Sequence, residues 1–266
     1  MELLQLTDFT KLSVEQWESV AGEYEAHKVR YLTLPCNIGD DLLWRQKDHL
    51  TKLLPILERH HLQFRAAHAL WWAFNDLDWP DEAGRKRMVR VQGKWLEIAA
   101  GCGARTMTFH PGVRWDGYRT STLFGKVRKS LDGLLPYAEK HRIIIALENN
   151  TVCEIGSIAD ELSDLVREFN SPWLGLCLDV GHAHVTEGVD VVMNSFSRDM
   201  VTCHLHDNDT SQDAHLPPGK GTVAWTKLVR FLKTRCPRLI NCEAEASLPA
   251  SMSHGQLADI YLKMWS

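Results

Sequence analysis

Nine side chains of metal-binding type follow short apolar runs along this chain, where predicted strands end. They are His68, His110, Glu148, Asp179, His182, His204, Asp213, His215 and Glu243. Imidazole nitrogens and carboxylate oxygens are the donors that divalent metals accept in enzymes. A strand buried on both faces reads as a continuous apolar run, and a polar residue at its carboxyl end reaches the rim where barrel enzymes do chemistry. The pattern therefore predicts a metal-dependent barrel enzyme.

The strongest candidates for one shared metal site come from four successive predicted strands. They are Glu148, Asp179, His204 and Glu243. Glu148 directly follows the apolar stretch 143–147, so its carboxylate is expected beside the barrel interior. An unpaired carboxylate is costly there, and a bound cation supplies the compensation. The donors suit Mn²⁺, Mg²⁺, Co²⁺ or Zn²⁺.

Two of these four choices leave an alternative open. His204 and His206 are two residues apart and face the same way on a strand, and we favour His204 as the ligand. Glu243 and Glu245 share a face for the same reason. We favour Glu243 because it directly follows the apolar stretch, and Glu245 is the reserve.

Further donors could complete a second metal site or bind substrate. His182 can face Asp179 if Gly181 lets the chain turn, and we favour a contact to substrate or to a ligand for it. The other members of this group are His68, His110, Asp213 and His215. A histidine at a strand end is often only hydrogen-bonded, so a single substrate-binding role is an equal alternative for them.

Aromatic side chains and one lysine are the expected substrate contacts. Tryptophan rings can stack on sugar rings or bases. The loops after the third and fourth predicted strands carry Trp71, Trp72, Trp79 and Trp115. Lys220 lies in a Pro-Gly-Lys-Gly turn and could meet a phosphate, although such a lysine is usually solvated. The sequence contains no nucleophile elbow, Walker motif or dinucleotide-binding fingerprint.

The elements that must position these side chains alternate along the whole chain, which favours parallel strand–helix units. The predicted strands are 2–6, 29–34, 62–67, 104–109, 142–147, 173–178, 201–205 and 239–242. The predicted helices are 14–27, 44–60, 80–101, 122–141, 157–169, 189–196, 225–234 and 255–265. We therefore predict an α/β fold, a single (β/α)8 TIM barrel forming one domain over residues 1–266.

Composition and charge narrow the function classes. The 266 residues are 44% hydrophobic, enough for one large core. A formal net charge of −4 argues against strong nonspecific attraction to nucleic acid. Seven cysteines, an odd number spread through apolar runs, favour reduced thiols and a cytoplasmic location. The sequence has no signal-peptide pattern and no apolar run long enough to span a membrane.

At these residues the chain resembles the xylose-isomerase-like barrel superfamily, which joins sugar isomerases and epimerases, inosose dehydratase relatives and the endonuclease IV group of AP endonuclease family 2. The resemblance spans nearly the whole chain and rests on LENN, LDVGH, HLHDND and DAHLPPGKG in this order. It implies that a divalent metal is held by Glu148, Asp179, His204 and Glu243. The endonuclease IV group implies up to three zinc ions, with further counterparts in His68, His110, His182, Asp213 and His215.

We therefore predict a divalent-metal-dependent sugar or sugar-phosphate isomerase or epimerase. The metal would polarise a carbonyl and an adjacent hydroxyl while Glu148 and Glu243 move a proton at the neighbouring carbon. One alternative is an endonuclease IV-like zinc phosphodiesterase acting on abasic DNA, which the acidic charge disfavours. Another is a non-catalytic sugar-binding barrel. The expected partner is a small sugar or sugar phosphate rather than nucleic acid or membrane, and the resemblance implies assembly as a homo-oligomer.

Overall fold

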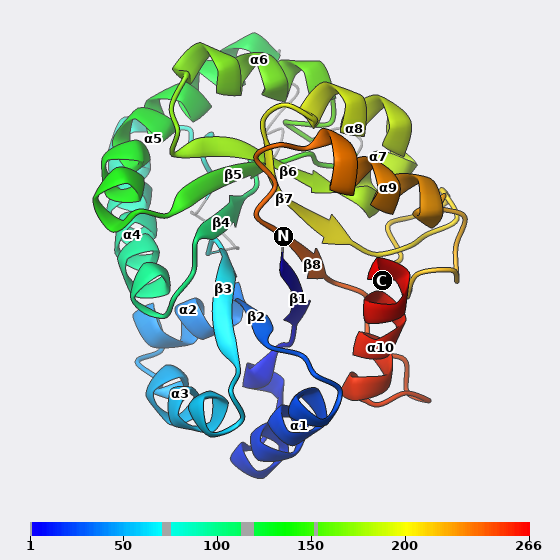
Figure 1. Ribbon diagram of the computed structural model, residues 1–266. Coiled ribbons are helices and arrows are strands. Elements are labelled where there is room, and N and C mark those ends of the chain that lie inside the picture. The colour runs from blue at the N-terminus through cyan, green and yellow to red at the C-terminus, as the bar shows by residue number, and fades with distance from the viewer. Residues whose placement is uncertain (1, 71–75, 113–119, 152–153) are drawn as a thin grey trace.

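The computed structural model describes residues 2–70, 76–112, 120–151 and 154–266, which form a closed barrel of eight parallel strands. The strands are β1 (Glu2–Leu6), β2 (Tyr31–Leu34), β3 (Gln63–His68), β4 (Thr106–Phe109), β5 (Ile144–Glu148), β6 (Leu174–Asp179), β7 (Met200–Leu205) and β8 (Asn241–Ala244). Each strand pairs with the next one in the chain, and β1 pairs with β8 to close the ring. The predicted (β/α)8 barrel is confirmed (Figure 1).

Helices surround the ring of strands, as Figure 1 shows. They are α1 (Val14–Ala26), α2 (Cys36–Leu43), α3 (His49–Arg59), α4 (Glu82–Gly101), α5 (Thr120–His141), α6 (Ala159–Phe169), α7 (Val180–Val185), α8 (Val189–Phe196), α9 (Trp225–Arg235) and α10 (His254–Trp265), with a short 3₁₀ turn η1 (Phe9–Lys11). Capping boxes start α1 and α10, because a serine accepts the N–H of a glutamine three residues later and that glutamine accepts the serine N–H.

Two helices differ from the sequence prediction for local reasons. The segment 44–60 is not one helix: α2 ends at Leu43 and α3 begins at His49. Gln46 between them has a φ of 53°, which an α-helix cannot accommodate. Helix α6 begins at Ala159 rather than at the predicted 157, and the Ala159 N–H donates to the Glu187 carboxylate at 2.7 Å.

The carboxyl ends of two strands, β6 and β8, also differ from the prediction, and both carry candidate metal ligands. The short helix α7 follows β6 directly, because the Asp179 carboxylate accepts the His182 N–H at 2.7 Å and caps the helix. Strand β8 does not end at 242 as predicted. It continues through Glu243 to Ala244, so Glu243 lies inside the strand instead of at its end.

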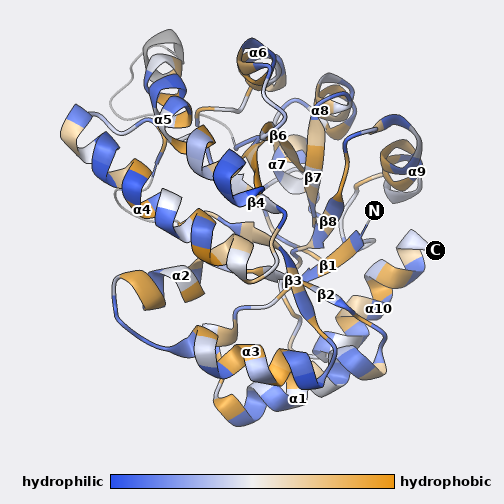
Figure 2. Ribbon diagram, turned by 60° about the vertical axis from the view of Figure 1, so that its left-hand side comes forward, coloured by the Kyte–Doolittle hydropathy of each residue, from blue (hydrophilic) through white to orange (hydrophobic). Residues whose placement is uncertain are grey.

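Apolar side chains fill the space between the strands and the helices. In α6, Leu162, Leu165 and Val166 are buried, whereas Asp164 is exposed. Figure 2 shows the resulting alternation of hydrophobic and hydrophilic turns along the helices. This layer encloses the outer surface of the barrel and holds the strand ends in a fixed ring.

The barrel interior contains a buried polar layer. Thr33 donates to Glu243 Oε2 at 2.8 Å, and Thr202 lies 2.7 Å from Glu243 Oε1. Thr202 also contacts Asn241, whose amide donates to Thr106 at 3.1 Å. All five residues are fully buried, so these hydrogen bonds replace those that water would supply.

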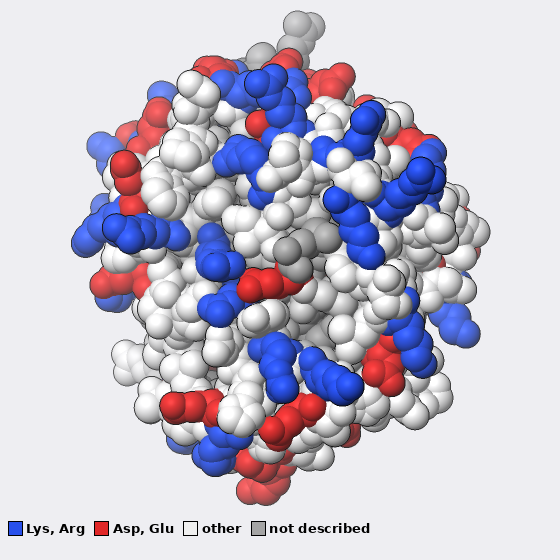
Figure 3. Space-filling view, viewed as in Figure 1, with Lys and Arg blue, Asp and Glu red and all other residues white. Residues whose placement is uncertain are grey.

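Charged side chains of both signs are interspersed over the face in Figure 3, with no continuous basic stripe. Among the described residues, no helix combines the length and apolarity needed to cross a membrane. The cysteines that the structure describes form no disulfide bond.

Candidate metal centre

The predicted ligands of strands β5, β6 and β7 meet at the carboxyl end of the barrel. Glu148 and Asp179 are the last residues of β5 and β6, and His204 is the last residue but one of β7. The strand register pairs Asp179 with His204. All three are buried, with 1% or less of their surface exposed. Neighbouring parallel strands therefore bring the three donors to one place, as the sequence predicted.

Three carboxylates surround one ring nitrogen of His204. Its Nδ1 lies 2.8 Å from Glu148 Oε1, 3.4 Å from Glu245 Oε2 and 3.6 Å from Asp179 Oδ2. Donor atoms of Asp179, His204 and Glu245 all lie within 4.8 Å of one another. We call Glu148, Asp179, His204 and Glu245 the central group. Its arrangement is that of a site where one cation would be shared by carboxylates and an imidazole.

Glu243 does not join the central group. Its two oxygens contact the hydroxyls of Thr33 and Thr202 in the polar layer below. Its Oε1 lies 3.8 Å from His204 Nε2, the ring nitrogen that faces away from the other carboxylates. The structure thus places the reserve candidate, Glu245, among the donors, and places the favoured Glu243 beneath them.

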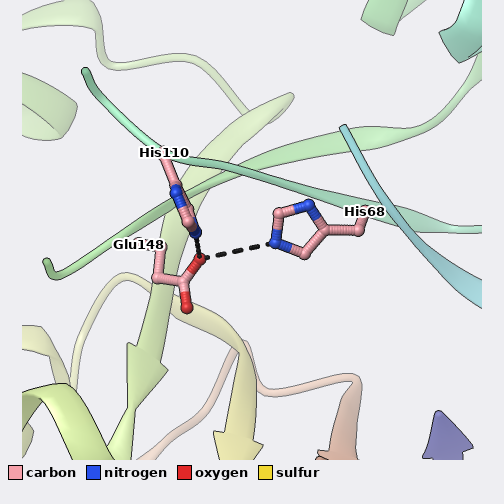
Figure 4. Close-up of side chains that lie close together, drawn as sticks. All are labelled: His68, His110 and Glu148. Carbon is pink, nitrogen blue, oxygen red and sulfur yellow. Dashed lines mark ion pairs between the residues drawn. The ribbon is translucent and has the colours of Figure 1, made fainter. Parts of the chain in front are cut away.

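A second group of donors shares Glu148, as Figure 4 shows. Glu148 Oε2 lies 2.8 Å from His110 Nε2 and 3.7 Å from His68 Nε2. The His68 Nδ1 lies 3.0 Å from the Ala69 carbonyl oxygen, which turns Nε2 towards Glu148. The two oxygens of Glu148 therefore face different histidines, with Oε1 on His204 and Oε2 on His110.

A third group of donors lies around Asp213, in the loop after β7. The Asp213 carboxylate is 3.1 Å from His215 Nε2, 3.3 Å from His182 Nε2 and 3.6 Å from His206 Nδ1. We call these four residues the rim group. Its members are less buried than the central group, apart from His206, which is fully buried.

His204 and His206 do point the same way from β7, but they serve different neighbours. His204 contacts Glu148, whereas His206 Nε2 lies 3.0 Å and 3.1 Å from the two oxygens of Asp179. The His206 ring also stacks on His215, with centroids 3.7 Å apart and planes 7° apart. The donors thus form one continuous chain in which imidazoles and carboxylates alternate.

Asn149, which the sequence analysis did not select, holds two of the predicted ligands in place. Its side-chain amide accepts the Asp179 N–H at 2.8 Å and donates to the Asp179 carbonyl at 2.9 Å. Its own carbonyl lies 2.8 Å from His182 Nδ1, which leaves His182 Nε2 for Asp213. An amide directly after the last residue of a strand was the available signal for this role.

Asp207, also missed, anchors the loop that carries Asp213 and His215. Its fully buried carboxylate accepts the N–H groups of Gly219 at 2.8 Å and Val223 at 3.1 Å, and the Trp225 indole N–H at 2.9 Å. Four residues of HLHDND therefore have separate tasks, since Asp207 and Asn208 shape the loop while His204 and His206 face donors.

Charge interactions within the cluster outweigh burial. Burial alone would raise the pKa of Glu148, but His204 and His110 hold it well below its usual value. Burial alone would lower the pKa of His182, yet Asp179 and Asp213 raise it to about 10. The metal-free cluster is therefore stabilised by protonated imidazoles beside ionised carboxylates, and a divalent cation could replace these protons.

Several buried polar atoms of the cluster have no hydrogen-bond partner. They include Glu245 Oε1, His206 Nδ1 and Asp213 Oδ1. Such atoms are costly to leave unpaired, and a coordinated ion removes that cost. Carboxylate oxygens and imidazole nitrogens are also the ligand types of Zn²⁺ and Mn²⁺. The residues present therefore fit a divalent metal.

The structure describes only some of the residues that the sequence predicted to contact substrate. Trp71, Trp72 and Trp115 lie outside the described residues. Trp79 packs against the start of α4, where its indole N–H donates to Asp81 at 2.9 Å. Lys220 is exposed in the loop that Asp207 anchors.

A model of the family described as xylose isomerase-like TIM barrel matches residues 27–259. The chain belongs to this family. The resemblance recognised in the sequence is thereby confirmed over most of its length.

The chain is similar to several individual proteins. The chain is 28% identical over 145 residues to the probable endonuclease 4 of Mycoplasma mobile, which covers 49% of this chain and 51% of that protein. It spans between 51% and 64% of the length of the curated relatives that it matches. Among solved structures, a D-tagatose 3-epimerase-like protein has 21% identity, coverage of 88% and 89%, and a TM-score of 0.72. The IOLI protein with a zinc atom has 15% identity, coverage of 99% and 98%, and a TM-score of 0.78. At these identities the two structures show a shared fold.

Proposed function

We propose that this protein is a divalent-metal-dependent isomerase or epimerase acting on a sugar or sugar phosphate. The observation that carries the proposal is the pair Glu148 and Glu245. These two carboxylates come from β5 and from the residue that follows β8, and both reach the same nitrogen of His204. Two carboxylates beside one ion are what a proton transfer within a single site requires.

The central group would hold the ion through Glu148, Asp179, His204 and Glu245. A bound divalent ion would polarise a substrate carbonyl and the hydroxyl beside it. One glutamate would then take a proton from the neighbouring carbon, and the other would deliver a proton. Delivery to the opposite face of the same carbon inverts that carbon. Delivery to the former carbonyl carbon, with the hydroxyl proton passing to the former carbonyl oxygen, moves the carbonyl along the chain.

Glu245 is the better partner of Glu148 in this transfer than Glu243. Glu245 Oε1 is buried without a hydrogen-bond partner, so it is available to a substrate proton. Both oxygens of Glu243 are already engaged by Thr33 and Thr202. The proposal therefore keeps the predicted two-glutamate chemistry and assigns its second carboxylate to Glu245.

A second candidate function is metal-dependent hydrolysis of a phosphoester. A specific observation favours it: Glu148 Oε2 faces His110 and His68, so Glu148 could bridge two ions. Paired ions would activate water and neutralise charge on the leaving oxygen. The similarity to a probable endonuclease 4 agrees with this candidate. Duplex DNA is the less suitable substrate for a chain with a net charge of −4.

The test is to follow proton transfer and phosphate release side by side. The protein, loaded with Mn²⁺ or Co²⁺ in D₂O, is incubated with ketoses and ketose phosphates, and NMR records deuterium at the carbon next to the carbonyl. The same preparation is incubated with abasic DNA and with small phosphodiesters. Deuterium incorporation supports the isomerase. Phosphoester cleavage without any deuterium incorporation would contradict it and support the second candidate.

A further inference from the structure

We propose that Gln92 and Trp95 of helix α4 are positioning residues for the candidate ligand His68. They hold the backbone at the end of β3, so that the ring of His68 presents one defined nitrogen to Glu148. The inference rests on the proposed function, in which Glu148 holds an ion. It adds two residues that act on the metal centre through the backbone of a ligand.

Helix α4 brings both side chains to the same place. Gln92 and Trp95 are three residues apart in the helix, so they lie on one face of it, and both are fully buried. Gly39 of α2 packs against this place from another side. A Cβ atom at Gly39 would lie 2.6 Å from Leu70 Cδ2 and 2.9 Å from Trp95 Cε2. The surroundings therefore leave Leu70 and Trp95 little room to move.

The Gln92 amide forms two hydrogen bonds with the backbone of Leu70. It accepts the Leu70 N–H at 3.2 Å and donates to the Leu70 carbonyl oxygen at 3.0 Å. The regular pairing of β3 with β4 ends two residues earlier, at His68. A side chain of α4 thus satisfies backbone groups that lie beyond the last paired residue of the strand.

Trp95 fixes the peptide group directly after His68. Its indole N–H donates to the His68 carbonyl oxygen at 2.9 Å. The N–H of the same peptide group belongs to Ala69 and donates to the Thr108 carbonyl oxygen at 2.8 Å. This peptide group is therefore held on one side by α4 and on the other by β4.

The ring of His68 takes its orientation from the next peptide group, which Gln92 holds. His68 Nδ1 lies 3.0 Å from the Ala69 carbonyl oxygen, and the Leu70 N–H of that same peptide group donates to Gln92. Donation to a carbonyl puts the ring proton on Nδ1. In the neutral ring Nε2 then keeps its lone pair, and a fixed partner on the far nitrogen sets the orientation of a metal-binding histidine.

The nitrogen selected in this way faces the second group of donors. His68 Nε2 lies 3.7 Å from Glu148 Oε2, and donor atoms of His68, His110 and Glu148 all lie within 4.8 Å of one another (Figure 4). A ligand that is already in place needs no ordering when an ion binds, which favours binding. Gln92 and Trp95 would thus raise the affinity for the ion that involves His68.

The experiment is a titration of the metal-free full chain with Zn²⁺ and, separately, with Mn²⁺. A His68→Ala variant identifies the binding step that depends on His68. The test variant is Trp95→Phe, which keeps an aromatic ring and removes the indole N–H. We expect it to weaken that same step by about 10-fold, the lower end of the effect of losing a partner that orients a metal ligand.

The matched control is Trp17→Phe. Trp17 of α1 is also buried, at 2% exposure, and its indole N–H also donates to a backbone carbonyl, that of Phe9, at 2.7 Å. Both variants should lose thermal stability, because each loses the same atoms from a buried ring. Only Trp95→Phe should lose metal affinity. A purely structural role for Trp95 predicts that the two variants bind metal alike.

A second variant and a spectroscopic measurement cover the case in which Trp95→Phe does not fold. Gln92→Met keeps the length of the side chain without its amide, and it should weaken the same binding step. NMR of the zinc-loaded wild type with ¹⁵N-labelled histidine should show the His68 proton on Nδ1 and the metal on Nε2. In a folded variant, this Nδ1 proton should exchange with water faster than in the wild type.

The possible failures are distinguishable. Wild-type metal affinity in a folded Trp95→Phe or Gln92→Met, or an ion bound through Nδ1 of His68, would overturn the inference and leave the proposed function standing. So would a His68→Ala variant that binds metal as the wild type does. A wild type that binds neither Zn²⁺ nor Mn²⁺ would contradict the proposed function and the inference together.

Discussion

Two buried polar layers lie one above the other at the carboxyl end of this barrel, and they differ in how their polar atoms are satisfied. In the lower layer, hydroxyls of Thr33 and Thr202 contact both oxygens of Glu243. In the upper layer, the central group sets carboxylates against imidazoles and leaves Glu245 Oε1 unpaired. Burial of polar groups alone therefore does not identify a functional site. Buried polar atoms without a hydrogen-bond partner do identify one.

The contrast is sharpest between Glu243 and Glu245, which are two residues apart in and just after β8. The Glu243 side chain is fully buried and the Glu245 side chain is nearly so, and both lie near His204, but on different sides of its ring. One is bound by the protein and the other is available to an ion. The predictions that follow test whether this difference separates structure from chemistry.

The largest effect is expected for Glu148→Gln. The amide cannot take up a proton from carbon, so kcat should fall by about 10³-fold, within the range for loss of a general acid–base group. The change keeps the shape of the side chain, so circular dichroism should be unchanged. Turnover of a ketose substrate is the measurement, and retained turnover in a folded variant would show that Glu148 moves no proton.

The second prediction compares Glu245→Gln with Glu243→Gln as a matched pair. Loss of a charged ligand in Glu245→Gln should weaken metal binding by about 100-fold, whereas Glu243→Gln should leave it within the same order of magnitude. Isothermal titration of the metal-free proteins with Mn²⁺ measures both. The reverse ranking would return the ligand role to Glu243, the residue favoured from the sequence.

The third prediction concerns removal of the metal. An ion that binds only the folded state stabilises it by about 2.7 kcal/mol at a free concentration 100 times its dissociation constant. Chelation should therefore lower the unfolding temperature, and added Zn²⁺ or Mn²⁺ should restore it. A melting temperature that is the same with chelator and with metal would mean that the central group holds no ion.

The smallest effect is a pH dependence of the metal-free protein. Burial would lower the pKa of His182, but Asp179 raises it from 6.5 to about 10. A histidine whose pKa is raised by folding contributes stability that is complete below pH 6.5 and is lost as the pH rises to about 10. Thermal unfolding in chelator should show this loss, and His182→Asn should reduce it. If the stability of the variant falls equally steeply with rising pH, groups other than His182 cause the pH dependence.

The same pH range should have the opposite effect on metal binding. An imidazole must lose its proton before it binds a metal, so the affinity should rise with pH while the metal-free protein loses stability. Proton release on addition of Zn²⁺, measured in weakly buffered solution, reports this exchange directly. Absence of proton release would mean that the histidines are neutral before the metal binds.

The sequence predicted the fold and the faces of the strands, but not the depth of each side chain in the barrel. Apolar runs revealed all eight strands, and a two-residue period correctly put Glu243 and Glu245 on one face. Which of two such residues reaches the rim depends on where the strand ends relative to its neighbours. The prediction ended β8 at 242, and the two further residues of the strand carry Glu243 into the polar layer.

The sequence pattern also did not predict which residues of different strands contact one another. Asn149 and Asp179 are 30 residues apart, and nothing near either one signals their paired hydrogen bonds. The division of tasks between His204 and His206 also depends on neighbours from other strands. The residue types of a site are thus readable from sequence, whereas their partners require the closed ring.

The most direct test of the central claim is an anomalous diffraction map of crystals grown with Mn²⁺. The account predicts a peak within about 2.5 Å of side-chain oxygen or nitrogen atoms of Glu148, Asp179, His204 and Glu245. A map with no peak among these four residues, or with a peak held by Glu243 in the polar layer, would contradict it.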